Sequence, residues 1–239
     1  MCQLCDKQNQ SRRDFLKAGA AGLVGGILLS SLPAFAAGGP TTSVTADEAI
    51  AKLKAGNDKY IKAPDVCAAQ LGKQREAVAK SQTPWATIVS CADSRVPPEL
   101  LFGGLGVGEL FVARNAGNMV DTATMGTIEY GSGVLGVPLI LVLGHERCGA
   151  VAAACEVVEK KTKFPGSIGP MVDAIVPAAQ AVVGRPGDFV DNTIRESALR
   201  TAKRIATESS ILSDLVKKGK LKVVAGRYDL DDGKVEFFS

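Results

Sequence analysis

The chain has 239 residues, of which 46% are hydrophobic and 5% aromatic, so it can bury one sizeable and mainly aliphatic core. Its formal net charge of +3 is small, and it therefore gives no electrostatic reason to expect a nucleic acid or an anionic membrane as partner.

The first 36 residues have the pattern of an export signal. Arg12-Arg13, within the run from Ser11 to Lys17, is typical of the twin-arginine route, and a moderately apolar stretch over 18–32 follows. This stretch is shorter than the roughly 20 residues of a membrane helix, and Ala34-Phe35-Ala36 after it has the small-residue pattern of a cleavage site. We expect cleavage near Ala36/Ala37, with a retained N-terminal anchor helix as the alternative.

Cleavage would leave a mature domain over 37–239 with a net charge of +1 and no stable membrane anchor. The twin-arginine signal places this domain in the periplasm or outside the cell. Nothing in the composition marks a boundary for a second domain, so we expect a single one.

Helical and strand patterns alternate along the mature chain. In chain order we expect a helix opening at 45 with a Thr45/Glu48 capping box, a helix over 74–80, strands over 85–90 and 109–115, a helix over 119–130, a strand over 138–144, a long amphipathic helix over 192–218, a strand over 221–226 and a terminal strand over 234–238. This alternation predicts an α/β fold in which a mostly parallel central sheet is flanked by helices, with an N-terminal helical arm and a C-terminal edge strand.

A glycine-rich run over 131–136 matches G-x-G-x-x-G by letters. The dinucleotide-binding motif needs a strand before the glycines and a helix after them. Here the order is reversed, so we interpret the glycines as a helix C-cap and a turn, and not as a nucleotide site.

The chain contains one histidine, His145, and Cys148 follows three residues later. Cys91, Asp93 and Arg95 lie upstream. Both groups come just after predicted strands, and parallel strands end at one edge of a sheet, so we expect them to meet there as a zinc site. His145 and Cys148 would face one way if a helical turn began at His145. Asp93 is an undecided fourth ligand, because Arg95 can hold its carboxylate instead.

Four cysteines remain after cleavage, namely Cys67, Cys91, Cys148 and Cys155. An exported protein invites a disulfide interpretation. The twin-arginine route carries folded proteins, however, and a bound metal would protect its thiolates. We therefore favour metal ligation by Cys91 and Cys148, and expect Cys67 and Cys155 to be plain buried thiols.

The two motifs, Cys91-x-Asp93-Ser94-Arg95 and Gly144-His145-x-x-Cys148-Gly149, resemble the signature of the β-class carbonic anhydrases. The resemblance covers most of 48–238 and includes the runs over 53–57, 96–99, 111–118 and 228–230. It implies one Zn²⁺ per subunit, held by Cys91, His145 and Cys148, with Asp93 at an exchangeable fourth position.

The resemblance also implies roles outside the metal site. Gln82 matches the glutamine with which plant-type members hold substrate, although Lys80-Ser81-Gln82 departs from the common glycine-glutamine pairing. The backbone amide of Gly149, at the start of a helix, is a further candidate donor to substrate. The family forms dimers or multiples of dimers, with the active site near the subunit interface.

The implied reaction is the reversible hydration of carbon dioxide to bicarbonate. Asp93 would accept a hydrogen from the attacking species, and Arg95 would hold Asp93. Because His145 is a ligand and no other histidine exists, we expect protons to leave through water to buffer or a surface carboxylate. Three alternatives stay open: a carbon disulfide hydrolase of the same fold, a non-catalytic zinc protein with a closed Cys2-His-Asp site, and a disulfide-bearing binding protein.

Overall fold

The computed structural model describes residues 41–63 and 71–238, so the expected export signal, its cleavage site and Cys67 lie outside the described residues. Within them, a five-stranded sheet has the order β2-β1-β3-β4-β5. The first four strands are mutually parallel, and the last one runs antiparallel to its neighbour. All five predicted strands are confirmed: β1 Ala86–Cys91, β2 Leu110–Asn115, β3 Leu139–His145, β4 Lys222–Tyr228 and β5 Val235–Phe238.

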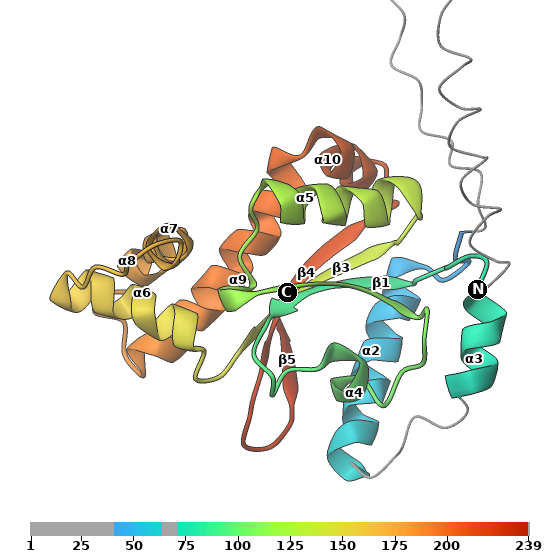
Figure 1. Ribbon diagram of the computed structural model, residues 1–239, viewed down its shortest axis with the longest axis horizontal. Helices are drawn as coiled ribbons and strands as arrows, with labels where there is room; N and C mark the ends of the chain where they lie inside the picture. The colour runs from blue at the N-terminus through green and yellow to red at the C-terminus, as the bar shows by residue number, and fades with distance from the viewer. Residues whose placement is uncertain (1–40, 64–70, 239) are drawn as a thin grey trace, which may run out of the picture. The chain divides into compact units, whose positions relative to one another are not determined.

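Helices cover both faces of this sheet, as Figure 1 shows, with α2 and α4 on one face and α5, α9 and α10 on the other, while α6, α7 and α8 group beside α9. Their bounds are α2 Ala46–Lys62, α3 Leu71–Val78, α4 Pro98–Leu101, α5 Thr122–Glu129, α6 Gly149–Lys160, α7 Ile168–Asp173, α8 Val176–Ala181, α9 Phe189–Glu208 and α10 Ser210–Lys217. Two short irregular turns, η1 Ala116–Asn118 and η2 Tyr130–Val134, complete the described elements. The predicted α/β architecture is confirmed.

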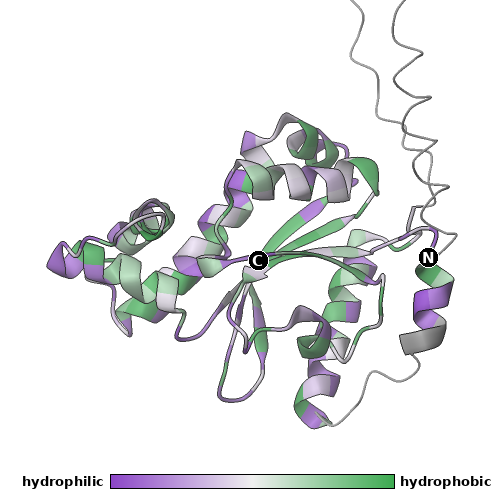
Figure 2. Cartoon of the chain, viewed as in Figure 1, coloured by the Kyte–Doolittle hydropathy of each residue, from purple (hydrophilic) through white to green (hydrophobic). Residues whose placement is uncertain are grey.

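The strands β1 and β3 are buried along their whole length, because the helices exclude water from both faces of the sheet. Ile88 and Leu141 pack with Phe102 on the face under α2 and α4. Val89 and Val142, one position on, pack on the face under α5 and α9. Figure 2 shows the resulting pattern, with hydrophobic colour on the central strands and hydrophilic colour on much of the outer helical surface. This rigid sheet positions the residues at its two edges.

The prediction of one long helix over 192–218 is wrong, because the segment is broken at Ser209. The Ser209 hydroxyl accepts a hydrogen bond from the amide of Leu212 and donates one to the Glu129 carboxylate at 2.6 Å. Ser209 thus caps a new helix, and its extended backbone ends the previous one. The apolar periodicity continues across the break, and for that reason the sequence pattern does not reveal it.

The glycine run after α5 also differs from the prediction. Gly131 and Gly133 lie within η2, a wider helical turn that continues α5, and only Gly136 makes the turn before β3, with φ of 72°. A Cβ at Gly131 would come within 2.9 Å of the Phe111 ring, so this glycine permits close packing against β2. The order of helix, glycines and strand stands, and it is unlike the dinucleotide-binding arrangement.

Three helices of the described chain, α4, α7 and α8, have no counterpart in the sequence-based prediction. All are short, and each contains a proline that interrupts an apolar pattern. The capping box predicted at the start of α2 is confirmed, since Thr45 and Glu48 exchange hydrogen bonds. Among the residues that the structure describes, none of the helices has the length and apolar character needed to cross a membrane.

Candidate metal centre

The candidate metal ligands meet at the edge of the sheet where the parallel strands end. The neighbouring strands β1 and β3 end with Cys91 and His145, respectively. Each of Cys91, His145 and Cys148 offers a donor atom within 4.8 Å of the other two, and all three residues are buried. The parallel pairing therefore brings together residues that are 54 positions apart, as predicted from the strand ends.

The structure has no helical turn from His145 to Cys148, which was the condition under which the spacing would make the two side chains face one way. His145 still belongs to β3, and the chain then reverses through Arg147, whose φ of 53° is in the left-handed region. Cys148 has extended backbone angles and is the N-cap residue of α6, which begins at Gly149. A left-handed turn and not a helix thus directs Cys148 toward His145, and the three-residue spacing alone does not distinguish the two.

The imidazole of His145 is fully buried and has only one hydrogen-bond partner among the described residues. Its Nδ1 lies 2.9 Å from the backbone carbonyl of Glu146, so Nδ1 carries the proton and donates it to that oxygen. The Nε2 atom has no partner, and the nearest carboxylate oxygen, on Asp93, is 3.9 Å away. Burying an unpaired nitrogen is costly, whereas a metal ion would satisfy it.

The two thiols lie at a separation that suits a shared metal. Cys91 Sγ and Cys148 Sγ are 4.0 Å apart, close to the about 3.8 Å expected for two sulfurs on one tetrahedral zinc. The hydrogen bond with Cys148 lowers the pKa of Cys91 to about 4, and the amide of Gly117, 3.3 Å from Cys91 Sγ, stabilises the thiolate further. The same hydrogen bond, with burial, raises the pKa of Cys148, because the pair shares one proton.

These cysteines are free thiols, as is Cys155, so the structure gives the disulfide alternative no support at the three positions it describes. Cys155 is buried and donates to the Thr193 hydroxyl at 3.3 Å. The prediction of a plain buried thiol is thus confirmed for Cys155.

Asp93 is paired with Arg95, and its Oδ2 lies 3.9 Å from His145 Nε2. Its Oδ1 accepts hydrogen bonds from Nε and the backbone amide of Arg95, both at 2.9 Å, and its Oδ2 accepts one from Nη2 at 2.7 Å. These bonds from the Arg95 guanidinium hold the pKa of Asp93 well below its usual range. Of the two arrangements left open by the sequence, the structure has the carboxylate paired with arginine, which leaves a fourth ligand position open.

Arg114, at the end of β2, was not among the predicted site residues. Its Nε donates to the carbonyl of Cys91 at 2.9 Å and its Nη2 to the carbonyl of Asp93 at 2.6 Å. The side chain therefore holds the loop that carries both residues. Arg114 lies opposite Ser90 in the parallel pairing of β1 and β2, next to the loop that it binds. The sequence does not give this register, so it could not identify Arg114.

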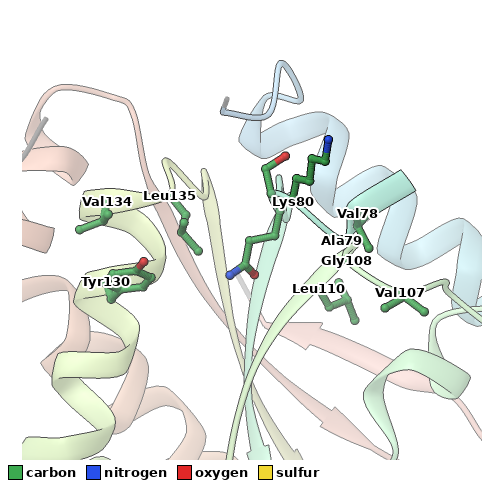
Figure 3. A pocket seen from close by; sticks show the side chains of 11 residues that line it. Val78, Ala79, Lys80, Val107, Gly108, Leu110, Tyr130, Val134 and Leu135 are labelled. Atoms are coloured by element: carbon green, nitrogen blue, oxygen red, sulfur yellow. The ribbon is translucent and has the colours of Figure 1, made fainter. Parts of the chain in front are cut away.

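Gln82 lies at the other edge of the sheet, where β1 begins, and its side chain is exposed. The length of β1 alone separates it from the metal donors by about 16 Å. It lines a pocket of about 620 Å³ together with Val78, Leu110 and Tyr130. Figure 3 shows Tyr130 and Leu135 on one side of this pocket, facing Val78 and Leu110. The structure thus does not bring Gln82 to the metal donors of its own chain.

Gly149 is exposed at the first position of α6, directly after Cys148. A Cβ placed on Gly149 would meet no atom within 4 Å, so the space beside its backbone is open. The amide is thus next to the donor set, in a position that a small molecule can reach.

Two thiols and a buried imidazole nitrogen without a partner are the donor set that zinc prefers. Three protein donors with an open position are typical of catalytic zinc, whereas a fourth protein ligand is typical of structural zinc. The residues present therefore fit a catalytic zinc ion better than a closed structural one.

Comparison with known proteins agrees with this site. Residues 86–235 match the family model described as carbonic anhydrase. The chain is 37% identical to carbonic anhydrase 2 of Mycobacterium tuberculosis over 76% of this chain and 87% of that protein, and 33% identical to the carbonic anhydrase of Mycolicibacterium smegmatis over 78% and 90%.

Solved structures extend the likeness to the fold. A β-carbonic anhydrase of Coccomyxa, in complex with acetazolamide, matches with a TM-score of 0.61 and 26% identity over 82% of this chain and 87% of that one. One of two tetrameric β-carbonic anhydrases of Sordaria macrospora matches with a TM-score of 0.62 and 21% identity, over 76% and 90%. The chain belongs to the carbonic anhydrase family and has the fold of the β-carbonic anhydrases.

Proposed function

We propose that this protein catalyses the reversible hydration of carbon dioxide to bicarbonate and a proton, with Zn²⁺ held by Cys91, His145 and Cys148. The observation that carries the proposal is the convergence of these three buried donors beside a carboxylate that is already paired with Arg95. The named carbonic anhydrase relatives favour the same substrate. They give no support to the carbon disulfide alternative.

The zinc ion supplies Lewis acidity when bound, and it lowers the pKa of a water ligand to about 7, a general value of which carbonic anhydrase itself is an example. The chain's own residues orient the reactants. Asp93 Oδ2 is the carboxylate oxygen nearest to His145 Nε2, at 3.9 Å, and it would accept a hydrogen bond from the attacking water and orient it. Because three hydrogen bonds from Arg95 keep this carboxylate ionised and in place, it acts as an acceptor throughout.

Arg114 has a positioning role in this scheme. By binding the carbonyls of Cys91 and Asp93, it fixes the backbone on both sides of Ala92. The relative positions of a metal donor and the hydrogen-accepting carboxylate then depend on β2 as well as on β1. The open backbone amide of Gly149 serves as a donor to a substrate oxygen.

The position of Gln82 leads us to infer a functional oligomer. Gln82 lies at the sheet edge opposite the metal donors, so it reaches substrate only in the site of another subunit. The apolar residues of its pocket, including Leu110 and Tyr130, would then form the wall of that partner's site. A homodimer or a higher even oligomer satisfies this requirement, and the Sordaria neighbour is described as tetrameric.

We further propose export by the twin-arginine route to the periplasm, with cleavage near Ala36/Ala37. The support is the Arg12-Arg13 pair and the small-residue site after the apolar stretch. Mass spectrometry of the protein recovered from a periplasmic fraction would test it, since a retained Met1 on the folded protein contradicts the proposal.

The decisive experiment is a stopped-flow assay of carbon dioxide hydration, from pH 6 to 9, on protein with one zinc per subunit. We expect turnover, and we expect the Asp93→Ala variant to lose most of it while keeping zinc. A zinc-replete protein without activity over this range contradicts the proposal. Loss of zinc or of folding in Asp93→Ala would instead support the closed, non-catalytic site.

A further inference from the structure

The turn between the two metal ligands, Glu146-Arg147, is attached to the hairpin loop that joins β4 and β5. The amide of Glu146 donates to the carbonyl of Tyr228, the last residue of β4, at 2.9 Å, and a Glu146 carboxylate oxygen accepts the amide of Leu230 in the loop at 3.1 Å. Arg147 forms a two-pronged ion pair with Asp231, at 2.7 and 3.1 Å. Both residues between His145 and Cys148 thus reach across to one loop, 84 positions away in the sequence.

The hairpin loop is itself firmly held. The Asp229 carboxylate accepts the amide of Asp231 at 2.9 Å, which closes the loop locally. Asn57, buried in α2, donates to the carbonyl of Gly233 at 2.9 Å and accepts the amide of Val235 at 2.8 Å. The loop is therefore a rigid support and not a free end, and a connection from α2 to the metal-ligand turn passes through it.

The Glu146 carbonyl links the hairpin loop to the orientation of the His145 imidazole. That oxygen receives the Nδ1 proton of His145, so the orientation of one peptide group determines which imidazole nitrogen faces Cys91 and Cys148. The peptide group lies between the anchored Glu146 and the left-handed Arg147. A change in its orientation would rotate the imidazole or remove its hydrogen bond.

We propose that Glu146 and Arg147, held by the hairpin loop through Leu230 and Asp231, are positioning residues that keep His145 aligned for metal binding and slow the loss of zinc. This inference rests on the proposed zinc site. It concerns two residues that the motif Gly144-His145-x-x-Cys148-Gly149 leaves unspecified.

The nearby carboxylates do not form a second metal site. Oxygen atoms of Glu146, Asp229 and Asp231 come within 4.8 Å of one another. Two arginine side chains already bind them, since Arg147 pairs with Asp231 at 2.7 Å and with Glu146 at 3.3 Å, and Arg227 pairs with Asp229 at 2.9 Å. The arrangement is that of a structural ion-pair network.

The contribution of the ion pair to overall stability is expected to be small, which makes a specific effect on zinc measurable. The side chains of Arg147 and Asp231 are 52% and 70% exposed, and exposed pairs add little to the free energy of unfolding. A variant that loses the pair should therefore stay folded, so that any faster release of zinc reports the alignment of His145.

The test uses the zinc-loaded full chain and measures the rate at which zinc passes to the chromogenic chelator 4-(2-pyridylazo)resorcinol. We expect Asp231→Asn and Arg147→Ala to release zinc about three- to tenfold faster than the parent protein, with little change in melting temperature. Arg147→Gly relieves the left-handed backbone but also lacks the ion pair, so it should release zinc faster too. The exchanged pair Arg147→Asp with Asp231→Arg should recover part of the slow release.

Arg204→Ala is the matched control, because Arg204 forms a similarly exposed ion pair with Glu208 on α9. It should release zinc at the parent rate. The inference is overturned if Asp231→Asn and Arg147→Ala release zinc like the parent, or if Arg204→Ala accelerates release equally. A parent protein that binds no zinc would overturn the proposed function itself, and this outcome is distinguished by the metal content before chelation.

Discussion

The two edges of the parallel sheet carry very different halves of the chemistry. At the edge where the strands end, Cys91, His145 and Cys148 are buried and close together, with Asp93 held beside them. At the edge where they begin, Gln82 and Tyr130 are exposed around an open pocket, and the described residues that line it include no cluster of metal donors. The candidate metal site is therefore complete within a single chain. Gln82 and Tyr130, in contrast, lie far from the metal donors of their own chain.

This difference indicates how the burial of a group relates to its role. The metal donors need desolvation and exact spacing, so they are built into strand ends and a helix N-terminus. Groups that contact substrate across subunits need exposure in the isolated chain. Exposure of Gln82 is thus consistent with function only if a second subunit covers it.

The largest effect is expected from removing the imidazole at the buried edge. His145→Ala deletes the donor with the unpartnered Nε2, so we expect loss of bound zinc and a fall in activity of more than about a thousandfold. Metal analysis and stopped-flow kinetics would measure both. Gln82→Ala is the control at the opposite edge and should retain zinc; a His145→Ala protein that keeps both zinc and activity would refute the assignment.

A smaller effect is expected at Asp93. Asp93→Asn keeps the shape but cannot accept hydrogen in the same way, so kcat should fall by about a hundredfold or more with zinc content unchanged. Equal activity of variant and parent would show that Asp93 has no role in the reaction.

The same substitution also tests the pH dependence of stability. Since Arg95 lowers the pKa of Asp93 in the folded chain, the ionised pair stabilises the protein at neutral pH, and this stabilisation is lost as the pH falls through the lowered pKa. Asp93→Asn should therefore be less stable than the parent at pH 7, and the two should converge in acid. Denaturant unfolding at several pH values measures the difference.

At the exposed edge, Gln82→Ala removes one amide contact to substrate, so we expect a fall of about tenfold in kcat/KM. A sharper test mixes this variant with His145→Ala, dissociates the subunits of both and lets them reassemble into mixed dimers. In a mixed dimer, the zinc-bearing site of the Gln82→Ala chain receives an intact Gln82 from its partner. Activity should rise above the sum of the separate variants; no rise would contradict the action of Gln82 across subunits.

The smallest effect concerns proton transfer. His145 is the only histidine of the chain, so with His145 bound to zinc as proposed, no imidazole side chain is free to carry protons to solvent. We expect turnover to rise by a few fold with buffer concentration until another step limits it. A rate that is constant from low to high buffer would indicate an internal route. Sodium sulfate at matched ionic strength is the control.

Local patterns were sufficient to predict the sheet and the convergence of Cys91, His145 and Cys148. An apolar run after Pro84 identified β1, and an apolar run flanked by glycines identified β3. Cys91 and His145 stood directly after these two predicted strands. Parallel pairing then required them to meet. The short helices α7 and α8 were missed because proline and glycine interrupt their periodicity.

The parts that could not be predicted depend on backbone conformation and on distance. Nothing in His145-Glu146-Arg147-Cys148 indicates that Arg147 adopts left-handed angles, because arginine rarely does so. The resemblance placed Gln82 with the substrate, although the strand predicted over 85–90 already stood between Gln82 and Cys91, and β1 confirms that separation. The hydrogen bonds of Arg114 likewise arise from the register between β1 and β2.

The hairpin loop has a consequence for the order of events during protein synthesis. All three metal donors leave the ribosome before Asp231, which follows Arg147 by 84 residues. Asn57 emerges earlier still, 178 residues before its contact with Val235. Such distant contacts close late in folding, since the chain entropy of long loops must be overcome first. A nascent chain thus presents a full set of metal donors before their support exists, and firm retention of the metal would mark completion of the fold.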